Sequence, residues 1–214
     1  MTNDNTLKLS DHILKSLRGA WELSRANPKA MQYFDLSSDG FWKSFWALGV
    51  MMPVYLLWAV FNIQTEPQTS GPMVSYPLLS ESIFFLSILP ITAFVMVYFT
   101  KFMKISENYA LMVIAFNWVN ALVFCLVTIA TIILGTGLVG EGISFFILVM
   151  LKFYFTIYVV WFTLKISLGI SGLLAAGVFL FISLLNACIQ VLLLMVFNPD
   201  YFEAVFAAVN IQPA

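Results

Sequence analysis

Long runs of apolar residues, separated by short polar or turn-forming segments, dominate the chain after residue 40. A helix needs about 20 apolar residues to cross roughly 30 Å of hydrocarbon. The runs that meet this length are residues 41–62, 82–100, 109–134, 143–164 and 170–197. None of them alternates apolar and polar residues, as the strands of a membrane β-barrel do. The pattern predicts an all-α, polytopic integral membrane protein with five transmembrane helices within residues 41–197.

Residues 1–40 are mixed in character and form a separate N-terminal region. At helical spacing, one face of residues 11–26 carries mainly apolar side chains: Ile13, Leu14, Leu17, Ala20, Trp21 and Ser24. The charged side chains lie away from that face: Lys15, Arg18, Glu22 and Arg25. This pattern predicts an amphipathic helix on the membrane surface or on a partner helix. Packing on the protein's own loops explains it equally well.

Positive charge is distributed unevenly between the two sides of the predicted bundle. Apart from Lys152, every lysine and arginine lies before or at the start of the first span, or in the second and fourth connections. Residues 63–81, 135–142 and 198–214 carry none. Because cytoplasmic loops retain lysine and arginine, we expect a cytoplasmic N-terminus and an extracytoplasmic C-terminus. Residues 198–214 would form an extracytoplasmic tail with a short helix.

Composition supports burial in lipid. Hydrophobic residues make up 61% of the chain and charged residues only 10%, whereas soluble domains carry about 25% charged residues. The net charge of −1 gives no electrostatic basis for binding nucleic acid. The lipid bilayer is therefore the expected surrounding.

Lys152 is the one charged residue deep inside a predicted span. A charge at that depth is unfavourable and marks a candidate functional site with a partner. Asn117 and Asn120 reach a similar depth on the third span, and Thr156 lies one turn beyond Lys152. We predict an intramembrane polar site in which Lys152 is held by these amides, by the carbonyl of Leu86, or by a bound anion or lipid headgroup. A neutral lysine, or one that faces a partner subunit, is the alternative.

The last span carries a stripe of small residues at nearly four-residue spacing: Gly172, Ala176, Ser183 and Ala187. Small side chains let membrane helices approach closely. We interpret the stripe as a helix-packing face within the bundle, with homodimerisation as the alternative.

Residue types that support catalysis or hold a cofactor are sparse. Residues 135–140 match the letters of a dinucleotide-binding loop, but they follow a membrane helix and no βαβ unit surrounds them. His12 is the only histidine, which excludes histidine-rich metal sites, and Cys125 and Cys188 both lie in apolar runs. We therefore expect no enzyme activity, no metal site and no cofactor.

The lead-in to the first span reads Pro-Lys-Ala-Met-Gln-Tyr-Phe at residues 28–34 and Phe-Asp-Leu-Ser-Ser-Asp-Gly-Phe-Trp at residues 34–42. Together with five spans, a cytoplasmic N-terminal region and short loops, the first stretch resembles bacterial members of the Yip1-like family of membrane proteins. The second stretch resembles that of uncharacterised alphaproteobacterial proteins. The resemblance implies a location in the bacterial cytoplasmic (inner) membrane. The Asp-Leu-Tyr-Gly-Pro type of motif found in eukaryotic members is not present. The resemblance implies a non-enzymatic protein that organises membranes or binds partners.

Two functions follow as hypotheses. The preferred one is a non-catalytic inner-membrane scaffold or accessory subunit that binds a protein partner, or a second copy, through its transmembrane helices. The alternative is a small transporter or channel protomer with a midplane polar site around Lys152. Solvent access to Lys152 distinguishes them, because a transport pathway requires a hydrated polar lining.

Overall fold

The computed structural model describes residues 3–65 and 76–203, with the side chains of residues 9–63 and 76–203. Within these ranges the regular structure is entirely helical. The helical segments long and apolar enough to cross a membrane are Ser38–Ile63, Leu78–Phe102, Ser106–Gly135, Glu141–Leu168 and Gly172–Phe197. The prediction of an all-helical, multi-pass membrane protein with five spans is therefore confirmed.

The spans are built from α2 (Ser38–Lys43) and α3 (Trp46–Thr65), α4 (Leu78–Phe102), α5 (Tyr109–Gly135), α6 (Glu141–Lys152) and α7 (Val160–Leu168), and α8 (Gly172–Phe197). A π-helix (Phe153–Val159) joins α6 to α7. Short 3₁₀-helices cover Pro28–Tyr33 and Ser106–Asn108. Most helices extend past the predicted boundaries, since interfacial residues such as Glu81 and Lys101 fit at helix ends.

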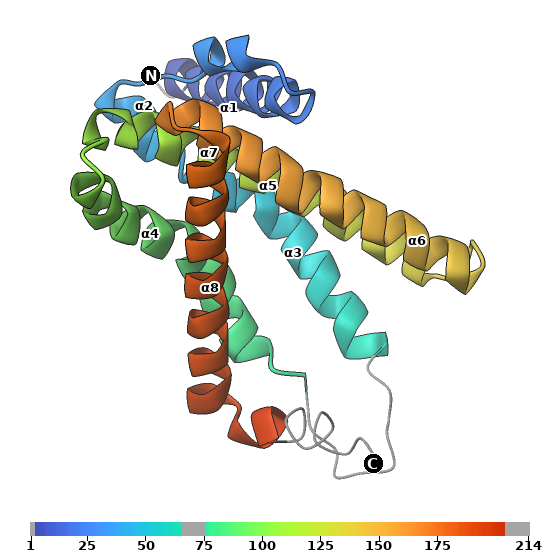
Figure 1. Cartoon of the computed structure of the whole chain (residues 1–214). Helices are drawn as coiled ribbons and strands as arrows, with labels where there is room; N and C mark the ends of the chain where they lie inside the picture. Colours follow the sequence, from blue (N-terminus) through green and yellow to red (C-terminus); the bar gives the residue numbers. More distant parts are fainter. Residues whose placement is uncertain (1–2, 66–75, 204–214) are drawn as a thin grey trace.

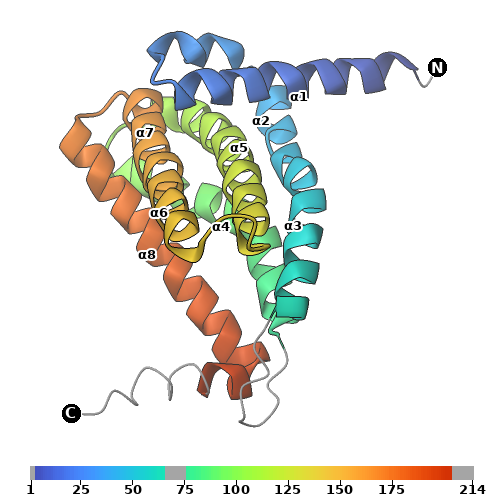
Figure 2. The same cartoon turned by 90° about the vertical axis from the view of Figure 1, so that its right-hand side faces the viewer.

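Helix α5 occupies the centre of the bundle. Its residues Met112–Val119 are all buried, and it contacts α1, α3, α4, α6 and α7 (Figures 1 and 2). In the most apolar stretch of each span, 56% of residues are buried for α5, against 17% for the α6–α7 span and 11% for α8. The fourth and fifth spans are therefore outer helices that keep most of their surface uncovered.

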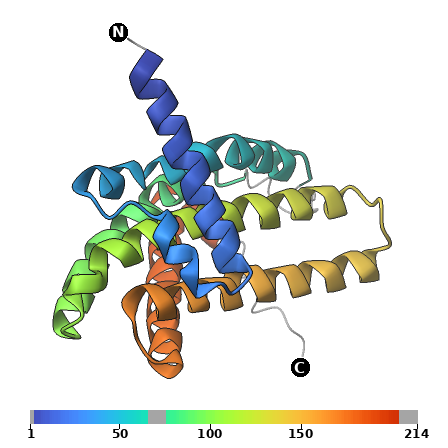
Figure 3. The same cartoon turned by 90° about the horizontal axis from the view of Figure 1, so that it is seen from above.

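Helix α1 (Asn3–Ser24) lies across one end of the bundle (Figure 3). It begins earlier than the predicted residue 11. Helix α1 contacts α5 and the 3₁₀-helix Pro28–Tyr33, and Ala20, Leu23 and Ser24 are buried, whereas Leu14 is 66% and Trp21 47% exposed. Part of the predicted apolar face therefore stays open. Its contact with the membrane surface or with a partner helix stays a prediction.

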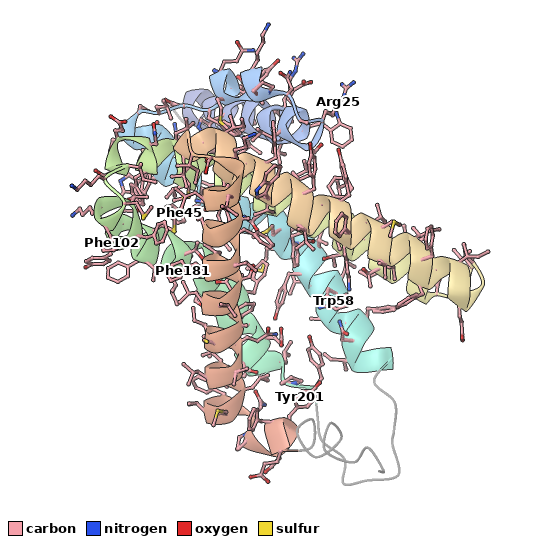
Figure 4. The ribbon with its side chains drawn as sticks, in the orientation of Figure 1. Arg25, Phe45, Trp58, Phe102, Phe181 and Tyr201 are labelled. Atoms are coloured by element: carbon pink, nitrogen blue, oxygen red, sulfur yellow. The ribbon has the colours of Figure 1, made fainter. Side chains whose placement is uncertain are left out.

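The basic residues gather at this same end, which we call the basic end. The α4–α5 and α7–α8 connections lie toward the end of the bundle that α1 covers (Figure 1). Lys101 and Lys165 lie in the last turns of α4 and α7, and Lys104 follows α4. Arg25, directly after α1, projects at the same end (Figure 4). The α5–α6 connection and the ends of α3 and α8 lie on the side away from α1.

Helix α8 packs against α4 through aromatic and polar contacts. The rings of Phe99 and Phe181 stack with their centroids 5.3 Å apart. Thr92 donates to Asn186 at 3.5 Å, and the Gln190 amide donates to Glu81 at 3.2 Å. Beyond α8, residues 199–203 are helical, and the rest of the predicted tail lies outside the described residues.

Two glycines provide a matched test of the fold, because Gly40 is tightly packed in α2 and Gly177 is open in α8. A methyl group at Gly40 would overlap the main-chain carbonyl oxygen of Asp35, whereas one at Gly177, within α8, meets nothing within 4 Å. We predict that Gly40→Ala lowers the free energy of unfolding by about 1–3 kcal/mol because backbone must shift. Gly177→Ala should raise it by up to about 1 kcal/mol. Unfolding in detergent provides the measurement, and equal effects of the two substitutions would contradict the packing around Gly40.

Candidate functional site

Lys152 is the last residue of α6 and directly precedes the π-helix. Its side chain is exposed, and within the described residues it makes no hydrogen bond or ion pair. Short π-helical segments inside longer helices are frequent at functional sites. The surface on the same face of α6 is apolar, with exposed large side chains at Phe145 and Val149, two turns and one turn before Lys152.

The asparagines predicted to hold Lys152 are engaged elsewhere. Asn117 is buried, and its amide donates to the Ser44 hydroxyl at 2.9 Å. The Asn120 amide donates to the main-chain carbonyl of Phe116, in its own helix, at 2.8 Å. Thr156 is exposed, as Lys152 is. The predicted polar site is therefore not assembled in this structure, because the lysine lies on the outer surface and Asn117 points into the bundle.

A hydrogen bond ties the middle of the fourth span to the basic end. The Tyr154 hydroxyl donates to the main-chain carbonyl of Ser24, in the last turn of α1, at 2.5 Å. The α5–α6 pair is inclined relative to α8 (Figure 1). Because the fourth span is inclined in this way, Lys152 lies closer to the basic end than would the middle of a span that ran straight across the membrane.

The small-residue stripe of α8 is not the face that the helix buries. The buried residues of α8 are Ala175, Val178 and Ile182. From the stripe, Gly172 meets Trp161, whose indole N–H donates to the Gly172 carbonyl at 2.8 Å. Ala176 is half-buried, and Ser183 and Ala187 are exposed. The interpretation as an intramolecular packing face therefore holds only at Gly172, where a side chain would crowd the tryptophan.

His12 lies where α1 meets the bundle, with its ring centroid 6.1 Å from that of Trp118. Both of its ring nitrogens, and the indole nitrogen of Trp118, are buried and have no hydrogen-bond partner among the described residues. Burial lowers the pKa of His12 below its ordinary value of 6.5; Asp35 and Asp39 act in the opposite direction, and Lys43 and Lys15 add to the lowering. A charged imidazole is therefore disfavoured at this junction.

A cavity that the sequence did not indicate lies between α3, α4 and α5 and includes Glu81 in its lining. Glu81 lies in the first turn of α4, and only the fold brings it beside the aromatic residues of α3 and α5. Within the described residues, no group of three or more histidine, cysteine, aspartate or glutamate side chains could hold a metal ion.

Comparison of the chain with protein-family models, with curated proteins and with solved structures finds no match. The candidate sites are therefore interpreted from their geometry alone.

The environment of His12 gives a pH-dependent prediction. Because its folded-state pKa lies below the value of 6.5, the unfolded chain binds the proton more tightly. Stability should be full above about pH 6.5 and fall by up to about 1.4 kcal/mol per pH unit below it, until the folded-state pKa is passed. His12→Phe should remove this slope in unfolding measurements between about pH 7.5 and 5.5. An unchanged slope in the variant would assign the pH dependence to other groups.

Proposed function

We propose that this chain is a non-catalytic scaffold or accessory subunit of a bacterial inner-membrane complex and that it binds its partner through the outer face of the fourth span. The observation that carries the proposal is Lys152, which is exposed on an apolar span and has no partner within the described residues. A charge in a span is unfavourable unless it is paired or reaches water. In the proposed complex, a carboxylate of the partner forms the ion pair with Lys152.

The partner is a different protein rather than a second copy. Within the described span segments, the carboxylates lie in the first turns of helices: Asp39, Glu81, Glu107 and Glu141. A second copy would therefore bring no acidic group to the middle of its own spans. A foreign membrane helix with a carboxylate at the depth of Lys152 satisfies the ammonium group and covers the apolar surface around it.

The transporter alternative receives less support from the geometry. It requires Lys152 and the asparagine amides to line one hydrated path. Lys152 lies instead on the outer surface, and Asn117 is buried with its amide bonded to Ser44.

The proposal includes a cytoplasmic basic end. Its support is the concentration of lysine and arginine there and the exposed indole rings of Trp21, Trp42 and Trp46 on α1–α3. Tryptophan is enriched at the membrane–water interface. Membership of the Yip1-like family stays part of the same proposal, supported by the five spans and the lead-in at residues 28–42.

Site-specific crosslinking in the native membrane tests this interface. A photoreactive phenylalanine at position 145, which is 71% exposed and shares the face of Lys152, should crosslink to a single foreign membrane protein. The same group at Phe116, which is 5% exposed, should not. Lys152→Met should reduce the crosslink yield at position 145 at least about tenfold, because the ion pair is lost. Lys101→Met, an exposed lysine at the basic end, is the matched control and should leave the yield unchanged.

Crosslinks from position 145 to lipid alone, or to a second copy of the chain, would contradict the proposed partner. A foreign crosslink that Lys152→Met leaves intact would place the interface correctly and remove Lys152 from it.

A further inference from the structure

The cavity between α3, α4 and α5 has a volume of about 160 Å³. It is lined by Met51, Tyr55 and Trp58 from α3, by Glu81, Phe84, Phe85, Ile88 and Leu89 from α4, and by Asn120 and Phe124 from α5. Cavities of this order in protein interiors accept a molecule the size of benzene. The space therefore suits one small organic group.

Aromatic rings form much of the wall and are held in fixed positions. Tyr55 and Phe85 stack with ring centroids 4.2 Å apart and planes at 15° to each other. The ring centroids of Phe85 and Phe124 are 5.6 Å apart. The Tyr55 hydroxyl is hydrogen-bonded to the Ser82 hydroxyl at 2.8 Å, which fixes the tyrosine ring. Trp58 lies one turn along α3 from Tyr55, toward the end of the helix that is away from α1 (Figure 4). Aromatic faces carry negative electrostatic potential and attract cations.

Glu81 adds a carboxylate to this wall. One of its oxygens accepts a hydrogen bond from the Gln190 amide at 3.2 Å, and the other has no hydrogen bond within the described residues. No ion pair to Glu81 forms within them either. A neutral amide brings no opposite charge, so the charge of Glu81 at the cavity wall has no ion-pair partner within the described residues.

We propose that this cavity is a binding site for an organic cation, namely a compact substituted ammonium group such as trimethylammonium with a short apolar substituent. The rings contact the alkylated ammonium group, and Glu81 neutralises its charge. Recognition of quaternary ammonium by aromatic residues is an established use of cation–π attraction. A neutral hydrocarbon fits the volume but leaves the carboxylate unpaired against an apolar surface, which is unfavourable. The site is independent of the partner surface around Lys152.

The test is calorimetric titration of the purified full-length chain in dodecyl maltoside, a detergent without an ammonium group, with benzyltrimethylammonium. The cation should bind, and neopentylbenzene, its neutral carbon analogue, should bind at least about tenfold more weakly. Equal affinity for the two compounds would overturn the proposal without reliance on any variant.

Variants then identify the groups responsible. Glu81→Gln keeps the shape of the side chain and should weaken cation binding at least about tenfold, while leaving the neutral compound unaffected. Glu141→Gln, at an exposed carboxylate in the first turn of α6, is the matched control and should bind as the parent does. Phe124→Leu keeps apolar volume without the ring and should weaken cation binding several-fold. Unchanged binding in a folded Glu81→Gln variant would overturn the proposal.

Competition identifies the source of the cation. Displacement of benzyltrimethylammonium by short-chain phosphatidylcholine would show that a lipid headgroup reaches the site. Binding that this lipid does not displace would assign the site to free organic cations. Each result supports a substituted-ammonium site and names its natural class of ligand.

Discussion

The arrangement of the molecule depends on the burial of α5. The side chains of Met112–Val119 are buried around the whole helix, and α1, α3, α4, α6 and α7 each pack against α5. Since lipid is as apolar as these side chains, close packing and a few hydrogen bonds, rather than escape from water, hold such helices together. Because α5 is covered on every side, the helices around it lie on the outside of the bundle. The fourth and fifth spans therefore remain mostly uncovered.

Polar side chains divide into those that join helices and those that are left free. The amides of Asn117 and Gln190 bridge to Ser44 and Glu81 on other helices, and such bonds contribute roughly 0.6 kcal/mol each in membranes. Groups without partners within the described residues include the ammonium of Lys152, one oxygen of Glu81 and the ring nitrogens of His12. Our proposals of a partner and of a ligand site rest on the first two of these groups, and the predicted pH dependence rests on the third.

Hydropathy predicted the number and the approximate limits of the spans, because length and apolar content alone determine whether a helix can cross lipid. It could not predict how each helix is rotated about its own axis, since a helix that is apolar all round has little periodicity to read. Lys152 therefore faces outward instead of toward Asn117, and α8 buries Ala175, Val178 and Ile182 instead of the small-residue stripe. The position of Glu81 beside Trp58 and Phe124 could not be predicted from hydropathy either, because it depends on tertiary packing.

We propose that protein, rather than lipid, covers the face of the fourth span around Lys152. Spin labels at positions 145 and 149, in a chain without Cys125 and Cys188, measure this directly through their accessibility to dissolved oxygen in native membranes. Oxygen accumulates in lipid and is excluded from packed protein. We predict low accessibility at both positions in the native membrane and a marked rise after purification into lipid nanodiscs. High accessibility in both settings would show that the face meets lipid and would contradict the account.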